Sequence, residues 1–419
     1  MPLLRHCSAD TLGTMRHGHS HSHSHGADGH AAELGLAPTV ERSLKVAVLV
    51  CAALTLVGLV LLWPSGDRSS LDPAVLGADP VEARVQSTVE QPCSYDALLP
   101  CVLVTIGVTS GDTSGEVFTI EQSLGGAGRP LTAGDDILVL ADRASDGTMI
   151  YSFYEHQRST PMLLLVLLFA TVIVVFGRWK GVGALAGLTM SLAVIVVFVL
   201  PSLLDGNNAV LVALVGTSLI AFVALYLAHG LHPTTSVALV STFAALVVTG
   251  ALSWVFIAAT RFTGYTDDST QFLDALSVPI DPRGILLAGI VIGSLGVLDD
   301  VTVTQVSAVW ELRAAQPTMS SSELVRAALR IGRDHISSTV NTLFLAYAGA
   351  ALPLLLLFSE ASQGIGSVAT REIVAVEIVR SLIGSIGLVS AVPISTWLAA
   401  QVVRPHDPAA AVSATMEAS

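Results

Sequence analysis

Residues 284–312 read GILLAGIVIGSLGVLDDVTVTQVSAVWEL, and this stretch decides the fold because it is long and apolar enough to cross a bilayer. It nevertheless carries two adjacent carboxylates, Asp299 and Asp300. On a helix, its small and polar residues recur at spacings of three and four, so they form one stripe while Leu, Ile and Val cover the other faces. We call this set the acidic stripe: Gly289, Gly293, Gly296, Asp300, Thr304, Ser307 and Glu311.

An acidic residue at the centre of a membrane helix costs about 2.5–3.5 kcal/mol on insertion scales and usually faces a partner or a wet cavity. The stripe is therefore the first candidate for a substrate or ion pathway. Gly289, Gly293 and Gly296 are small enough for close helix packing. An alternative interpretation is that both aspartates are solvated at the membrane interface and only mark the end of the span.

The composition of the whole chain agrees with a membrane protein. Of 419 residues, 52% are hydrophobic and only 13% are charged, whereas soluble proteins have about 25% charged residues. The net charge of −13 gives no basic patch for nucleic acid, so we expect none as a partner. The main expected partner is the lipid bilayer.

Eight apolar runs predict an α-helical polytopic protein with about eight transmembrane helices. The runs lie at 44–63, 161–176, 183–204, 209–227, 234–259, 284–304, 338–358 and 378–401. The predicted division is a disordered tail (1–43), a first helix (44–63), a polar region (64–160), a seven-helix membrane domain (161–403) and a second tail (404–419). Lys and Arg near the short loops favour an orientation in the cytoplasmic membrane with both termini cytoplasmic.

The polar region would then lie outside the cytoplasm. Five alternating, β-branched runs predict a small β-rich domain inserted between the first two helices, of a barrel or sandwich kind. The runs lie at 81–91, 102–109, 116–122, 136–141 and 149–155. Cys93 and Cys101 flank a short loop there, and an extracytoplasmic location predicts a disulfide between them. Such a domain is most often a structural or docking module.

The N-terminal tail holds His17, His19, His21, His23 and His25, alternating with Ser or Gly. Neutral imidazoles bind zinc, nickel or copper, but a disordered chain fixes no coordination geometry. The favoured interpretation is a solvated tail that binds Zn or Ni adventitiously, so no resident cofactor is expected. Met15 precedes the cluster and is an alternative start of translation.

Four stretches resemble the YibE/F-like family of bacterial membrane proteins. They are FGRWKGVGALAGLTMSL (176–192), LAGIVIGSLGVLDDVTVTQVSAVWEL (287–312), RIGRDHISSTVNTLFLAYAGAALPLLLLF (330–358) and EIVRSLIGSIGLVSAVPIS (377–395). A polar β-rich region before the second span also resembles the YibE type, so the resemblance covers most of residues 80–400. Other members often carry a single acidic residue near Asp300, which leaves open which aspartate matters. The resemblance implies a multi-pass membrane protein and no particular reaction.

Two functions remain. In a secondary transporter or permease, Asp299 and Asp300 would bind a proton or cation. Arg333 or Asn341 would pair with one of these carboxylates across the helix interface. The predicted pathway also includes Thr304 and Glu311. The alternative is a non-transporting scaffold or accessory subunit, which docks an envelope protein or a related membrane subunit through the β-rich domain. The sequence has no phosphate-binding glycine loop, HExxH or GxSxG, so we expect no enzyme.

Overall fold

The computed structural model describes residues 38–65, 80–96, 98–111, 113–124, 129–143, 149–265, 280–360 and 364–403. The five histidines predicted as a weak metal site, His17, His19, His21, His23 and His25, lie outside the described residues. The tail 404–419 also lies outside them.

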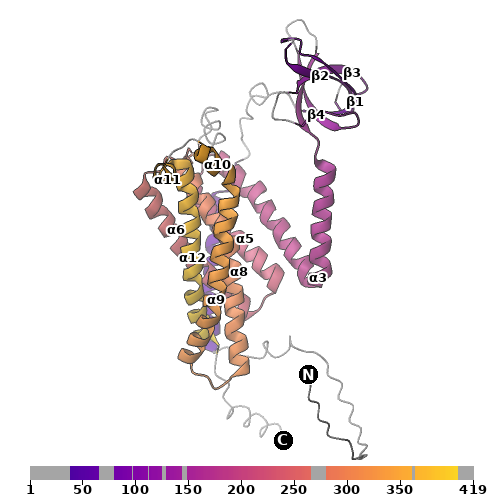
Figure 1. Ribbon diagram of the computed structural model, residues 1–419. Coiled ribbons are helices and arrows are strands. Elements are labelled where there is room, and N and C mark those ends of the chain that lie inside the picture. The colour runs from indigo at the N-terminus through magenta and orange to yellow at the C-terminus, as the bar shows by residue number, and fades with distance from the viewer. Residues whose placement is uncertain are drawn as a thin grey trace, which may run out of the picture.

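Most of the described chain forms a bundle of helices, and a small sheet stands at one end of it (Figure 1). The helices are α1 (Pro38–Leu61), α3 (Ser159–Val194), the π-helical η2 (Ile195–Val199), α4 (Leu200–Leu204), α5 (Ala209–His229), α6 (Pro233–Thr260), α8 (Pro282–Ala315), α9 (Ser321–Ala350), α10 (Leu352–Glu360), α11 (Ile365–Ala369) and α12 (Glu372–Val402). We call the end of the bundle that carries the sheet the sheet side. The turn between α8 and α9 lies at the opposite end (Figure 1).

Six segments of the described chain are long and apolar enough to cross a membrane, which makes this a multi-pass membrane protein with the bilayer as its environment. They are Thr39–Leu61, Ser159–Leu204, Ala209–His229, Pro233–Thr260, Pro282–Ala315 and Glu372–Val402. The count of eight spans therefore stays a prediction, since the structure departs from it at two places.

The first departure is in α3, which joins two of the predicted runs, 161–176 and 183–204. Arg178 has φ 50° and ψ −132°, which no helical residue adopts. The helix therefore breaks there into two arms, and Figure 1 shows them meeting at an angle.

The second departure concerns the run predicted at 338–358. This run is not a separate helix but the end of α9 together with α10. Helix α9 begins much earlier, because Ser320 and Glu323 form a capping box at its start. Its first half is too polar to be recognised from hydropathy.

Helix α8 is the centre of the bundle and packs against α5, α6, α9 and α12. Its apolar faces contribute Val291, Leu295, Leu298 and Val301 to the largest buried cluster. In α12, Gly387 lies so close to α6 that a Cβ at this position would collide with Thr249. Small residues at such positions let membrane helices approach closely.

The β-rich region predicted between the first two helices is confirmed as one five-stranded antiparallel sheet. The strands are β1 (Val81–Pro92), β2 (Pro100–Val108), β3 (Val117–Ser123), β4 (Asp136–Arg143) and β5 (Met149–His156), in the order β3-β2-β1-β4-β5. The sheet curls until its two edges meet, since the rings of Phe118 on β3 and Tyr151 on β5 have centroids 4.1 Å apart. Alternate residues fill the enclosed core, as the period of two predicts.

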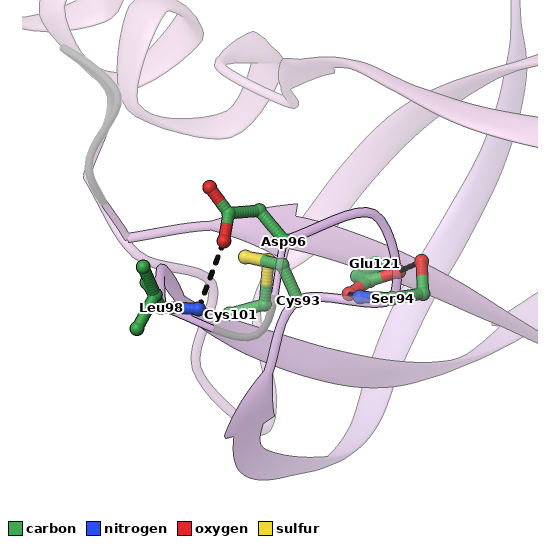
Figure 2. Close-up of a disulfide and its surroundings, with 6 residues drawn as sticks. All are labelled: Cys93, Ser94, Asp96, Leu98, Cys101 and Glu121. Atoms are coloured by element: carbon green, nitrogen blue, oxygen red, sulfur yellow. Dashed lines mark hydrogen bonds between the residues drawn. A yellow bond between two sulfur atoms is a disulfide. The ribbon is translucent and has the colours of Figure 1, made fainter.

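The disulfide between Cys93 and Cys101 is confirmed, and it closes the loop between β1 and β2 (Figure 2). Inside the loop, Asp96 Oδ1 accepts a hydrogen bond of 2.9 Å from the backbone N–H of Leu98. At its edge, the backbone N–H of Ser94 donates to Glu121 Oε1 on β3 at 2.7 Å, and the Ser94 hydroxyl donates to the other carboxylate oxygen. The loop is thus fixed to the sheet at both the disulfide and Glu121.

Candidate functional site

The acidic stripe lies on α8 with every one of its members exposed on the surface of the bundle. The apolar faces of the same helix are buried against its neighbours. This is the reverse of a helix that faces lipid, where the apolar residues point outwards. The periodicity of the sequence therefore places the residues on one face correctly, and the fold turns that face away from the protein interior.

The two aspartates differ in their surroundings. Asp300 belongs to the exposed stripe, whereas Asp299 is half-buried beside it. The hydroxyl of Thr304, also on the stripe, donates to the backbone carbonyl of Asp300 at 2.8 Å and leaves the carboxylate free of that contact. Neither carboxylate forms an ion pair within the part of the chain that the structure describes. Asp300 is thus the acid that the stripe presents to an incoming group.

The depth of Asp300 follows from the length of α8. Asp300 lies 18 residues after Pro282, which corresponds to about 27 Å along the axis at about 1.5 Å per residue. Beyond it, Val306, Val309 and Trp310 still pack in an apolar cluster with Leu44 of α1. Apolar packing within the bundle therefore continues for about 15 Å past Asp300.

Arg333 and Asn341, the two partners predicted for the carboxylates, both lie exposed on α9. Neither forms a hydrogen bond or ion pair with Asp299 or Asp300 among the described residues. Helices α8 and α9 are nevertheless neighbours. The structure therefore places these groups on neighbouring helices without pairing them.

The glycines of the stripe have no close neighbour either. A Cβ at Gly289 or Gly296 would meet no atom within 4 Å, and one at Gly293 would meet only the Tyr347 hydroxyl, at 3.9 Å. Their predicted role in helix packing is therefore not fulfilled by another described helix of this chain.

Sequence reasoning missed the polar contacts that fix α8 on its buried side. Thr302 and Thr242 of α6 have hydroxyl oxygens 2.7 Å apart. Gln305 Nε2 donates to the backbone carbonyl of Ala328 on α9 at 2.9 Å and to Thr396 Oγ1 on α12 at 2.7 Å. These contacts fix the buried side of α8 against α6, α9 and α12. The sequence signal for these contacts was the presence of polar residues, Thr302 and Gln305, on the otherwise apolar side of this run.

Arg313, near the end of α8, is fully buried and was also missed. Its Nη1 donates to the backbone carbonyls of Pro317, at 3.4 Å, and Met319. The guanidinium therefore holds the turn that leads from α8 into α9 through Nη1, while its Nε and Nη2 are buried without a hydrogen-bond partner among the described residues.

Among the described residues, one group of Cys, His and acidic side chains is close enough to hold a metal, namely Cys93, Cys101 and Glu121. Both sulfurs are already joined in the disulfide, so neither is available as a thiolate ligand. The sheet therefore contributes no metal centre from these residues.

Comparison with curated proteins and with solved structures gives no match. In the comparison with protein families, the YibE/F-like protein family matches residues 165–405. The match includes α8 with its stripe and also Arg333 and Asn341, and it begins after the sheet. Because it covers more than half of the chain, the protein belongs to the YibE/F-like family.

Proposed function

We propose that this protein is a permease that moves a proton or a small cation along the acidic stripe of α8. The observation that carries the proposal is the exposure of Asp300, with Thr304 and Ser307 next to it, on the central helix of a membrane bundle. Lipid tails offer such groups no hydrogen bond, whereas a wet pathway does. No catalytic step is part of the proposal.

The proposed topology has eight crossings. Both arms of α3 are counted separately because of the break at Arg178, and α9 with α10 forms a crossing of its own. In Figure 1, α9 and α10 together run from the turn after α8 to the sheet side, which supports this count. An even number places both termini on one side of the membrane.

The proposed orientation puts that side in the cytoplasm of a bacterial cell, with the sheet outside. Arg313, Arg326 and Arg330 flank the turn between α8 and α9, at the end opposite the sheet. Positive residues in short loops favour the cytoplasmic side. The disulfide in the sheet agrees with an oxidising, extracytoplasmic environment.

A flux measurement tests the proposal. The purified full-length protein is placed in proteoliposomes, with a pH-sensitive dye for protons and radioactive tracers for Na⁺, K⁺ and a divalent cation. We expect one of these ions to cross faster than in protein-free vesicles. The double variant Asp299→Asn, Asp300→Asn should lower that flux at least about tenfold, because the pathway loses its charged groups.

The matched control is Asp281→Asn, which removes a carboxylate from the N-cap position of the same helix, outside the stripe. It should leave the flux unchanged. Absence of flux for all four ions, or full flux in the double variant at equal protein content, contradicts the proposal.

A scaffold that docks an envelope protein is the second candidate, and one observation favours it. The disulfide-closed loop holds Tyr95 and Leu98, whose side chains are 68% and 92% exposed. Rigid, exposed apolar side chains are typical of docking surfaces. The flux measurement separates the two candidates, since a scaffold carries no ion.

A further inference from the structure

The surface formed by α8 and α9 carries opposite charges at the same depth in the membrane. The hydrogen bond between Gln305 and the Ala328 carbonyl fixes the register of these two helices. Because the two helices are antiparallel, moving one residue forward along α8 corresponds in depth to moving one residue backward along α9. The Gln305 side chain also lies against Gly332, so Asp300 is level with Arg333, and Gly296 with Ser337, to within about one helical turn.

All four of these residues are exposed, and neither Asp300 nor Arg333 has an ion-pair partner within the described ranges. A charge that faces lipid alone is strongly disfavoured, and acidic and basic residues within membranes pair with one another. The surface thus holds the acid Asp300 and the base Arg333 at nearly equal depth, both unpaired, with the exposed Asp334 next to Arg333 and the half-buried Asp299 next to Asp300.

We propose that a second copy of this chain covers this surface and completes the ion pathway. A two-fold axis along the membrane normal keeps depth unchanged, so it brings Asp300 of each copy level with Arg333 of the other. The isologous contact then contains the same ion pair twice. The proposal rests on the bundle lying in a membrane with the stripe as its pathway, as proposed above.

The glycines fit the same arrangement. Gly289 and Gly296 leave open space where a Cβ would be. Small residues on a helix let a second helix approach closely, so α9 of the partner has room above the sheet-side half of the stripe. On the other half, the polar side chains from Asp300 to Glu311 keep the space between the copies wet.

Disulfide crosslinking between two differently tagged copies tests this interface in native membranes. Both copies carry Cys7→Ala and Cys51→Ala. One copy also carries Gly296→Cys, and the other carries Ser337→Cys. We expect a crosslinked species that contains both tags, because the two positions are level and face each other between copies.

The matched control replaces Gly296→Cys with Val247→Cys on α6. Val247 is 68% exposed, and the contact between Thr242 and Thr302 places it at nearly the same depth as Gly296. This pair should not crosslink. If this control pair crosslinks as well as the Gly296→Cys and Ser337→Cys pair, the crosslinks come from random collision and the proposal is overturned.

Charge reversal tests the pairing itself. Arg333→Glu in both copies should lower the crosslink yield at least about tenfold, because four carboxylates then face one another. Adding Asp300→Arg to both copies should restore the yield, since the pairs reform with exchanged signs. A yield that neither change affects overturns the ion pair between copies.

The remaining outcomes are also decisive. The proposal of a second copy is overturned if this surface crosslinks to a different membrane protein, or if only uncrosslinked monomers carrying a single tag are found. The crosslink does not depend on transport. A crosslinked pair without ion flux therefore contradicts the permease and leaves the dimer standing, while flux with a monomeric protein does the reverse.

Discussion

At the scale of single residues, Gln305 decides which face of α8 is buried. Its amide is buried and joins three helices, through Ala328 on α9 and Thr396 on α12. The acidic stripe itself could be predicted from the sequence, because the spacing of three and four is visible in one run. The direction in which the stripe faces could not, since it depends on partners far along the chain.

Gln305→Ala should therefore destabilise the protein. It removes two buried hydrogen bonds and leaves the Thr396 hydroxyl and the Ala328 carbonyl without this donor, at a cost of roughly 1–3 kcal/mol. Thermal unfolding of the purified protein in detergent measures the effect as a lower Tm. Ser307→Ala, at an exposed position on the same helix, is the control and should change the Tm little. Equal Tm values for the two variants would count against this role of Gln305.

At the scale of elements, the strands could be predicted to within about two residues because alternation of apolar and polar residues directly reflects burial on one face. The helices were harder. Helix α9 begins at Ser321 rather than at Ser338, because its first half is amphipathic and buries Leu324 and Ala328 against other helices. Hydropathy recognises lipid-facing helices better than helices that pack on protein.

The sheet contains three carboxyls that should make it sensitive to acid. Hydrogen bonds lower the pKa of each from its usual value: the Ser94 hydroxyl and N–H act on Glu121, the Thr132 N–H on Asp135, and the Arg84 guanidinium on Asp136. A lowered pKa in the folded state stabilises the sheet above the unfolded-state pKa, near 4. That stabilisation is lost as the pH falls through the lower, folded-state values.

Hydrogen exchange of peptides within residues 81–156 measures this, after correction for the intrinsic pH dependence of exchange. We expect protection to fall as the pH drops below about 4. In Asp136→Asn, which cannot titrate at that position, the loss of protection should be smaller. A sheet equally protected at low and neutral pH, or an unchanged acid response in the variant, would show that these carboxyls are not linked to stability.

At the scale of the whole molecule, the polar face of the central helix lies on the outside of the bundle. Such a surface in a membrane has to meet water, ions or another protein, because lipid cannot hydrogen-bond to it. The family and the membrane class could be predicted from the sequence. The exposure of the stripe could not, because it depends on how α5, α6, α9 and α12 surround α8.

Accessibility to a charged, water-soluble thiol reagent is the most direct test of this account. Single cysteines are placed at Thr304 and Ser307 on the stripe, at the exposed position Val247 on α6 and at the buried position Leu298, in a chain that lacks Cys7 and Cys51. In native membranes, the account predicts that the stripe positions react at least about tenfold faster than Val247 and Leu298, because only the stripe faces water. Stripe cysteines that react no faster than the cysteine at Val247 would contradict it.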